Sequence, residues 1–281
     1  MGASLGLALK KRLPSLRVAA YARRQATRDA ALAEGVADVV LDSPAEAVLD
    51  ADVVVLCVPI MTMPALLKDC AEALKPGCIV TDVGSTKADL AQRLAPMLEG
   101  TQAMFIGSHP VCGSEKQGLE EGDPDLYEGA VVVVTPTEDH PEDAVAQLTQ
   151  LWEQAGSVVR IMTPLRHDEI LARTSHLPHM AAVLVAAAVA RDDVAEVGAF
   201  CGTGFQDTTR VAEGSPDIWR DIAESNGDAL LGELQALRKE LDALTQMLSD
   251  HDYEQLHRYL ETVRTKRKTL LATRRDGPGT A

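Results

Sequence analysis

The chain has 281 residues, of which 46% are hydrophobic, and its formal net charge at pH 7 is −15. This length suffices for one large domain or two ordinary ones with a well-buried core, and the hydrophobic share is normal for a globular protein. The acidic balance, with no basic patch to offset it, argues against nucleic acid as a partner. No run of about 18 apolar residues is present, so we expect no membrane-spanning segment.

The N-terminus and the cysteines indicate a cytoplasmic protein. Met1 leads directly into a helix-like stretch that lacks the features of a signal peptide. The cysteines are scattered, with no C-x-x-C pair and no metal-binding spacing, which is typical of free thiols in a reducing compartment. They are Cys57, Cys70, Cys78, Cys112 and Cys201.

Residues 1–162 alternate strand-like apolar runs with amphipathic helix-like runs. The predicted strands are 17–22, 39–41, 53–58, 78–83, 103–108, 130–135 and 157–161. The predicted helices between them include 27–34, 63–74, 87–97 and 141–155. Strands that alternate with helices predict βαβ units and a mostly parallel sheet. The nearly continuous apolar run 53–58 is typical of a strand buried on both faces.

From about Met162 onward the sequence predicts helices only. The predicted helices are an apolar one at 167–190, a leucine-rich one at 228–250 and a last one at 253–271, followed by a frayed tail at 274–281. Leucines at alternating spacings of four and three fit either a core helix of a bundle or a dimer seam. They are Leu230, Leu234, Leu237, Leu241, Leu244 and Leu248. We therefore expect an α/β domain at 1–162 and an all-helical domain at 163–281, with a ligand cleft between them.

The first residues resemble the end of a dinucleotide-binding fingerprint. A Rossmann-like domain begins with a strand and then G-x-G-x-x-G, which opens a helix. Here Gly2 corresponds to the last glycine of this motif, and Ser4 lies in the helix that follows it. Residues 17–22 correspond to the second strand of the domain. We expect that Met1 is an internal methionine and that the natural protein carries roughly ten to twenty more residues, enough for one strand and a turn. An ordinary helix start at Gly2 is the alternative.

In a Rossmann-like domain, the residue that binds the 2′ position of the cofactor's ribose lies just after the second strand. An acidic residue there favours NAD, and arginine favours the 2′-phosphate of NADP. Arg23 and Arg24 stand at this point, and no carboxylate occurs until Asp29. The pair favours NADP over NAD, and a solvated basic turn is the alternative.

The segment 107–118 is polar and glycine-rich and contains His109, Glu115 and Lys116. Its glycines let the backbone turn sharply and let a ligand approach closely, and a histidine titrates near neutral pH. Taken alone, the segment is more typical of a polar surface loop that contains a histidine.

Several motifs in chain order change that balance. They are Cys57-Val58-Pro59, Asp82 to Lys87, the His109 segment, Ser175 to His179, and 204–212 followed by 216–222. This ordered set resembles the prephenate and arogenate dehydrogenase family of tyrosine biosynthesis. The resemblance extends from Gly2 to about Asn226 and departs from the family at the missing first strand.

The resemblance implies an NAD(P)-dependent oxidative decarboxylation of prephenate to 4-hydroxyphenylpyruvate, carried out by a homodimer that associates through the helical domain. It implies that His109 is the hydrogen-bond and proton acceptor for the ring hydroxyl. It also implies that Ser85 forms a hydrogen bond beside the nicotinamide, and a helix N-cap is the alternative role for this serine. Lys87 is either structural or a source of positive potential. The implied substrate-binding residues are His179, Arg210, Glu115 and His176. The implied cofactor-binding residues are Gly2, Ser4, Arg23, Arg24, Val58, Pro59 and Ser85.

Other interpretations remain open at this point. A preference for arogenate, or for both substrates, fits the same residues, as does a catalytically impaired homologue that lacks the first strand. A β-hydroxyacid dehydrogenase should carry a catalytic lysine on the first long helix, where this chain has His176 and His179. These two histidines share a helix face, but no H-E-x-x-H occurs, so we expect no metal.

Overall fold

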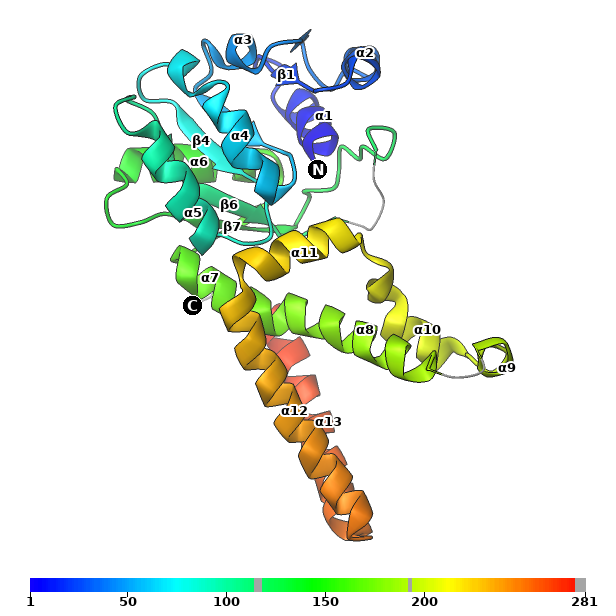
Figure 1. Cartoon of the computed structure of the whole chain (residues 1–281). Coiled ribbons are helices and arrows are strands. Elements are labelled where there is room, and N and C mark those ends of the chain that lie inside the picture. Colours follow the sequence, from blue (N-terminus) through cyan, green and yellow to red (C-terminus); the bar gives the residue numbers. More distant parts are fainter. Residues whose placement is uncertain (114–117, 192–193, 276–281) are drawn as a thin grey trace. The chain divides into compact units, whose positions relative to one another are not determined.

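The computed structural model describes residues 1–113, 118–191 and 194–275 (Figure 1). The chain divides into two compact units, Met1–Leu230 and Leu231–Ala281. The predicted change from strands to helices at Met162 falls inside the first unit. Along the described part of the chain, no helix is both long enough and apolar enough to cross a bilayer.

The strands of the first unit form three small sheets. They are β1 (Ala19–Tyr21), β2 (Val39–Leu41), β3 (Val53–Leu56), β4 (Ile79–Asp82), β5 (Met104–Phe105), β6 (Gly107–Pro110), β7 (Val131–Thr135) and β8 (Val158–Ile161). The pair β1–β2 is parallel, and β4 lies between β3 and β5 with all strands parallel. In the third sheet β7 is antiparallel to β6 and parallel to β8. Every predicted strand is present within a few residues.

Two details of the strand prediction were wrong. The run 103–108 is two strands, because β5 follows β4 whereas β6 turns to pair with β7, and Ile106 lies between them. The run 53–58 is not buried on both faces, since Val53, Val54 and Val55 are half-buried and only Leu56 is buried. The cause is that β3 is the edge strand of its sheet among the described residues, so neighbours flank it on one side only.

Helices and short helical turns connect the strands and continue beyond them. In the α/β part they are α1 (Gly2–Arg12), α2 (Gln25–Ala33), α3 (Pro44–Val48), η1 (Ile60–Thr62), α4 (Met63–Lys68), η2 (Ala71–Ala73), α5 (Ala88–Leu94), η3 (Ala95–Leu98) and α6 (Glu142–Gln154). After β8 follow α7 (Pro164–Leu171), η4 (Ala172–His176), α8 (Leu177–Val189), α9 (Val194–Gly198), α10 (Thr203–Thr209), η5 (Arg210–Glu213), α11 (Pro216–Ser225), α12 (Gly227–Ser249) and α13 (Tyr253–Arg275).

Strand β4 lies at the centre of the α/β part. Ile79 and Val80 are consecutive, so their side chains point to opposite faces, and both are fully buried. Ile79 belongs to a core with Leu5 of α1 and Trp152 of α6. Val80 belongs to a second core with Leu67 of α4 and Leu90 of α5. Helices therefore cover both faces of the strands (Figure 1), as parallel sheets require.

The predicted helix 167–190 is interrupted. Helices α7 and α8 are joined by η4, a π-helix over Ala172–His176. A π turn holds an additional residue per hydrogen-bonded turn, so it changes the face on which the residues after it lie. Beyond α8, the turn η5 packs against both α8 and α10, and α11 packs against α5 and η1.

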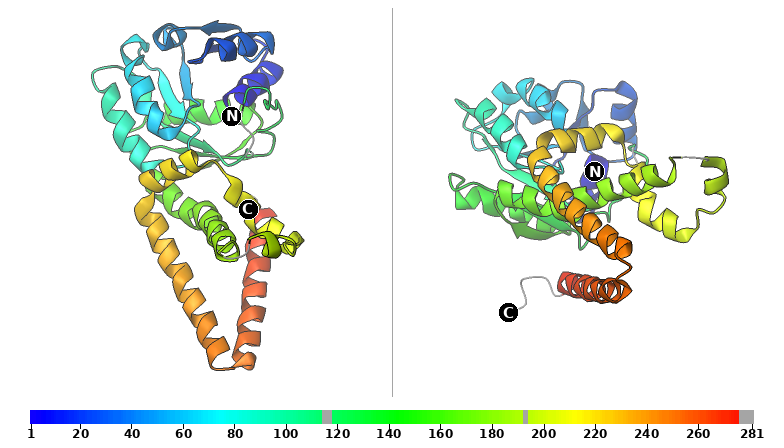
Figure 2. Two further views of the ribbon diagram at one scale, coloured as in Figure 1. Left: turned by 45° about the vertical axis from the view of Figure 1, so that its right-hand side comes forward. Right: turned by 60° about the horizontal axis from the view of Figure 1, so that its bottom comes forward.

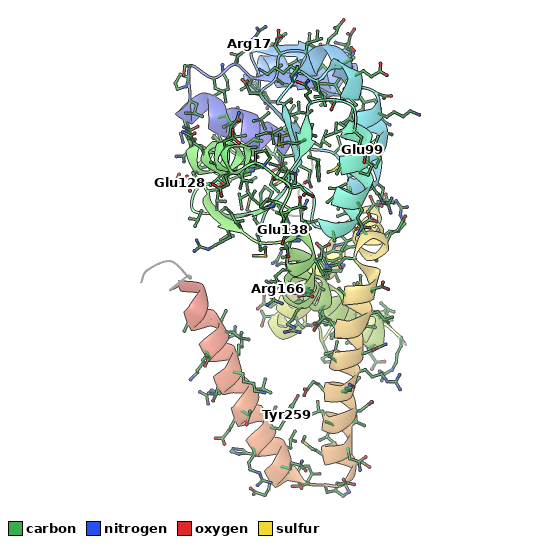
Figure 3. The ribbon with its side chains drawn as sticks, turned by 90° about the vertical axis from the view of Figure 1, so that its left-hand side faces the viewer. Arg17, Glu99, Glu128, Glu138, Arg166 and Tyr259 are labelled. Atoms are coloured by element: carbon green, nitrogen blue, oxygen red, sulfur yellow. The ribbon has the colours of Figure 1, made fainter. Side chains whose placement is uncertain are left out.

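The second unit contains most of α12 and all of the described part of α13, which run in opposite directions (Figure 2). The turn between them contains His251 in the left-handed region, with φ 55°, and the Asp252 N–H donates to Met247 O over 3.0 Å. Tyr259 lies between the two helices (Figure 3), and its hydroxyl donates to Glu240 over 2.7 Å. Helix α13 extends through Arg275, so residues 274 and 275 of the predicted frayed tail are helical, and the rest of that tail lies outside the described residues.

Candidate active site

His109 lies on β6 and is 8% exposed. Its Nδ1 is 2.8 Å from Nε2 of His167, which is fully buried on α7, and the two rings meet edge to face with centroids 5.0 Å apart. The strand and the helix that carry these rings are 58 residues apart in sequence. The buried histidine pair therefore forms only when the helix after β8 packs against β6.

His167 is held in turn by its neighbour Asp168. Their side chains approach to 2.7 Å between Nδ1 and Oδ1. The Asp168 carboxylate also accepts the backbone N–H groups of Lys87 and Ala88, each over 2.8 Å. Asn226 donates to the Asp168 carbonyl over 2.9 Å. A continuous buried hydrogen-bonded chain thus runs from His109 to the start of α5.

The imidazoles of this cluster are neutral near pH 7. Burial lowers the pKa of His109 well below its ordinary value, and the positive charge of Lys87, like that of His167 or His176 when protonated, acts in the same direction. Burial also lowers the pKa of His167, although its hydrogen bond to Asp168 opposes the shift. A neutral, buried imidazole is able to accept a proton from a substrate.

Lys87 forms a buried ion pair with Asp82. Both side chains are fully buried, and Asp82 also accepts the N–H groups of Gly84 over 2.7 Å and Ser108 over 3.2 Å. Burial raises the pKa of Asp82 and lowers that of Lys87, and in each case the partner opposes the shift. Of the two predicted roles, this contact supports the structural one, because it ties the start of α5 to Asp82 at the end of β4, which in turn accepts the N–H of Ser108 next to His109.

Ser85 lies half-buried in the loop between β4 and α5. The alternative role predicted for it, helix N-cap, was wrong: the N-cap residue of α5 is Lys87, with no side-chain cap of its own. The reason is that the carboxylate of Asp168 takes the N–H groups that a capping side chain would otherwise satisfy. Neighbouring Thr86 shares a buried hydrogen bond of 2.8 Å with Ser225 of α11.

His176 and His179 both contact Trp219 of α11. The His179 ring stacks on the indole with centroids 3.4 Å apart and planes at 9°, and His176 meets it edge-on at 6.0 Å. Burial lowers the pKa of His179 and brings that of His176 to about 4. Nδ1 of His179 and Nε2 of His176 are buried and find no hydrogen-bond partner among the described residues. Buried polar atoms normally have a hydrogen-bond partner, so these two nitrogens set the helical side of the site apart.

Asn226 links this second histidine group to the first, since its Nδ2 lies 3.4 Å from His176 Nδ1 and also binds Asp168. Arg210 is exposed on η5, which packs against α8, the helix of His179. Glu115 lies outside the described residues. Across the described part of the chain, no group of three or more His, Cys, Asp or Glu is arranged to hold a metal ion.

The start of α1 has the properties of an anion site. The first amides of a helix have no intrahelical acceptor and carry partial positive charge, and α1 has no acidic residue in its first turn. A Cβ on Gly2 would come within 2.9 Å of Cys57 Cβ, so only glycine lets the helix start this close to the end of β3. These features fit the pyrophosphate of a dinucleotide. Ser4 is buried, and its hydroxyl accepts the Asp123 N–H over 3.1 Å.

Val58 and Pro59 follow β3, half-buried and exposed respectively, and Arg23 and Arg24 are exposed just after β1. Arg28 of α2 fixes the turn that carries this arginine pair, because its guanidinium donates to Ala22 O over 2.8 Å and to Arg23 O over 3.1 Å.

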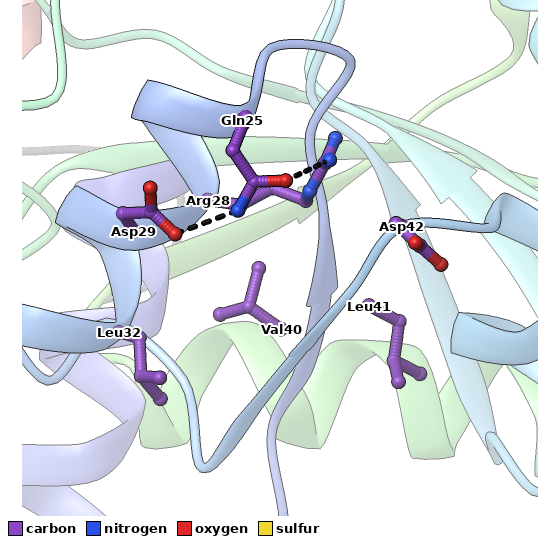
Figure 4. A pocket seen from close by; sticks show the side chains of 7 residues that line it. All are labelled: Gln25, Arg28, Asp29, Leu32, Val40, Leu41 and Asp42. Atoms are coloured by element: carbon purple, nitrogen blue, oxygen red, sulfur yellow. Dashed lines mark hydrogen bonds between the residues drawn. The ribbon is translucent and has the colours of Figure 1, made fainter.

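A pocket of roughly 230 Å³ lies between α2 and the end of β2 (Figure 4). Arg28 donates to Gln25, and Gln25 to Asp29, at its rim. Its lining residues are Gln25, Arg28, Asp29, Leu32, Val40, Leu41 and Asp42. None of them belongs to the His109 cluster, so this pocket is separate from the candidate active site.

Comparison with known proteins assigns the family. A model described as "Prephenate dehydrogenase, nucleotide-binding domain" matches residues 5–161, and one described as "Prephenate dehydrogenase, dimerization domain" matches residues 163–262. The chain belongs to the prephenate dehydrogenase family. The predicted family and the predicted fold class, a Rossmann-like domain followed by a helical domain, are both confirmed.

Individual relatives match over nearly the whole chain. A cyclohexadienyl dehydrogenase of Zymomonas mobilis is 32% identical over 98% of this chain and 94% of its own length. A prephenate dehydrogenase of Bacillus subtilis is 32% identical over 96% of this chain and 73% of its own length. The structure of Aquifex aeolicus prephenate dehydrogenase in complex with hydroxyphenyl propionate and NAD+ is similar with a TM-score of 0.89 at 31% identity, covering 96% of this chain and 94% of that one.

Sequence reasoning missed the residues that surround His109. His167 and Asp168 were assigned only to an apolar helix, and Asn226 only marked the end of the resemblance. No local signal set this pair apart, because polar and charged residues such as Glu169 and Arg173 recur along the same stretch of helix. Buried polar groups need partners, and these partners lie far away in the sequence.

Proposed function

We propose that this chain catalyses the NAD(P)-dependent oxidative decarboxylation of prephenate to 4-hydroxyphenylpyruvate. Family membership supports this function, and so do relatives named as prephenate and cyclohexadienyl dehydrogenases. The observation that carries it is the neutral, buried His109 with His167 fixed at 2.8 Å. Such a group is suited to take a proton from a ring hydroxyl.

The chemistry divides between cofactor and protein. When bound, the nicotinamide dinucleotide supplies the hydride acceptor. His109 accepts the hydroxyl proton at the ring nitrogen that does not face His167, while the carbinol carbon gives up its hydride. The carbon–carboxylate bond then breaks, CO₂ leaves, and its electron pair completes the aromatic ring. The proton held by His109 returns to the phenolate oxygen, so the base is regenerated.

The substrate carries two carboxylates, and the helical part of the first unit supplies the groups proposed to bind it. Arg210 offers a guanidinium whose planar fork matches a carboxylate. His179 is held by its stack on Trp219, and His176 supports it from the same helical segment. Ser85 is proposed to hydrogen-bond beside the nicotinamide, and Glu115 is proposed to lie at the mouth of the site.

The cofactor is proposed to lie along the start of α1. Gly2 and Ser4 belong to its first turn, and Val58 and Pro59 follow the neighbouring strand β3. Arg23 and Arg24 stand after β1, where they would reach a 2′-phosphate. We therefore propose a preference for NADP over NAD. The chain is also proposed to work as a homodimer.

Steady-state kinetics with prephenate and arogenate, each with NAD and NADP, tests these proposals together. Prephenate with NADP is expected to give the highest kcat/KM. A higher value with arogenate would reassign the substrate and leave the reaction type intact, and a higher value with NAD would refute the role of the two arginines. No turnover of either substrate would refute the proposed function.

A further inference from the structure

We propose that Asp168 and His167 are positioning residues that fix the tautomer of His109, so that its Nε2 is the proton acceptor. The inference rests on the proposed function for its consequence in catalysis. Its structural content, a single tautomer of His109, does not depend on any substrate.

Asp168 acts as a hydrogen-bond acceptor at both of its carboxylate oxygens. Its two carboxylate oxygens accept the N–H groups of Lys87 and Ala88, each over 2.8 Å, and the side chain is almost completely buried. An ionised carboxylate only accepts hydrogen bonds. Asp168 therefore faces His167 as an acceptor.

The short contact between Asp168 and His167 determines which nitrogen of His167 carries the proton. Nδ1 of His167 lies 2.7 Å from Asp168 Oδ1, a separation at which two lone pairs would repel. His167 must therefore carry its proton on Nδ1 and donate it. Because a neutral imidazole has one N–H and one acceptor nitrogen, Nε2 of His167 becomes an acceptor.

The tautomer of His167 in turn determines the tautomer of His109. Its Nδ1 lies 2.8 Å from His167 Nε2, which can only accept, so His109 donates from Nδ1. The lone pair of His109 is then on Nε2, the nitrogen directed away from His167. The chain of contacts thus selects one of the two tautomers, and it is the one in which Nε2 is basic.

The arrangement also explains how a buried histidine can take up a proton at all. Burial and the positive charge of Lys87 disfavour the cation on His109. A proton gained at Nε2 is shared through two hydrogen bonds with the carboxylate of Asp168. The same division of roles, in which a buried carboxylate orients a catalytic imidazole and stabilises its cation, operates in serine proteases.

The test is nitrogen-15 NMR of the histidine side chains in the ligand-free enzyme, with the His109 signals assigned by their loss in His109→Asn. Wild-type His109 is expected to be the Nδ1–H tautomer. In Asp168→Asn the amide cannot replace both acceptors, because Oδ1 accepts the Lys87 N–H and His167 while Oδ2 accepts the Ala88 N–H, so His167 loses its fixed acceptor. His109 is then expected to lose its single Nδ1–H tautomer, with kcat at least about 100-fold lower and KM within about threefold.

Glu169→Gln is the matched control, because Glu169 is the next carboxylate on α7 and is paired at the surface with Arg166 over 2.9 Å. It is expected to keep both the rate and the tautomer. If Asp168→Asn does not fold, His167→Gln leaves the contacts between Asp168 and α5 in place and is expected to abolish the single tautomer. An Nε2–H tautomer in the wild type, or the same tautomer in wild type and variants, overturns the inference. Lack of turnover by the wild type refutes the proposed function instead, and the NMR result still decides the tautomer.

Discussion

The imidazole of His109 is 8% exposed between β6 and α7, and its Nδ1 lies 2.8 Å from a second buried imidazole. Replacement by asparagine keeps a polar side chain of similar size but removes the basic nitrogen. His109→Asn is therefore expected to retain substrate binding and to lower kcat at least about 100-fold, the usual contribution of a general base. His257→Asn, at an exposed histidine of α13, is the control. Unchanged turnover in His109→Asn would contradict the assigned role.

The buried histidines also predict how stability depends on pH. Burial brings the pKa of His176 to about 4, whereas in the unfolded chain a histidine titrates near 6.5. Between these values the unfolded chain binds more protons, so this contribution to stability is complete above about pH 6.5 and is lost as the pH falls toward 4. His109 acts in the same direction.

Melting temperatures measured between about pH 7.5 and pH 4.5 check this expectation. The wild type is expected to lose stability as the pH falls, and His176→Gln is expected to show a shallower dependence. His257→Gln, which changes an exposed side chain, should keep the slope of the wild type. If the stability of His176→Gln depends on pH as steeply as that of the wild type, burial does not lower the pKa of His176.

The residues of the candidate site were only partly predictable. His109 and His179 stand in short motifs that a sequence displays directly. His167 and Asp168 acquire their roles through partners that are 58 and 81 positions away. No local pattern specifies such a contact, because it depends on how α7 packs against β6 and α5.

Among the secondary-structure elements, β4 is joined to the start of α5 by the ion pair of Asp82 and Lys87, in which both side chains are fully buried, and Asp82 also accepts the Ser108 N–H of β6. Removing one partner of such a pair leaves an uncompensated charge in the interior. Lys87→Met is therefore expected to lower the free energy of unfolding by about 3–5 kcal/mol. Adding Asp82→Asn should restore part of the loss, because no buried charge then remains.

Urea unfolding of the two variants measures these changes. Lys11→Met is a suitable control, since Lys11 pairs with Asp125 at the surface over 2.6 Å, and exposed pairs contribute little to stability. A Lys87→Met variant as stable as Lys11→Met would show that the ion pair does not hold these elements together.

The strands were more predictable from the sequence than the boundaries and interruptions of the elements. Apolar runs bounded by polar turns located each strand, because strand formation here follows from burial of contiguous side chains. The division of 103–108 into β5 and β6 was not predictable, since it depends on which neighbouring strand each half meets. The π-helix η4 had one local signal, Pro178, which has no N–H to donate to the carbonyl of Thr174 inside η4; this proline predicts an interruption of the helix, although not its π form.

For the whole molecule, the leucines of α12 predict association of two chains. Leu234, Leu237 and Leu244 are only half-buried in the single chain, and Leu241 and Leu248 are 60% and 48% exposed. Their spacings of three and four place them along one side of the helix, and a contiguous exposed apolar stripe of this kind marks an interaction surface. Exposure in the single chain therefore favours the dimer seam over the core of a bundle.

Sedimentation equilibrium should give twice the mass of one chain. The double variant Leu241→Glu with Leu248→Glu places charge on the stripe, so it is expected to be monomeric at micromolar concentration while its far-ultraviolet circular dichroism remains that of the wild type. Lys239→Glu adds the same charge on the opposite side of α12 and should remain dimeric. A wild-type monomer would refute the dimer, and a double variant that stays dimeric would assign the interface to another surface of the chain.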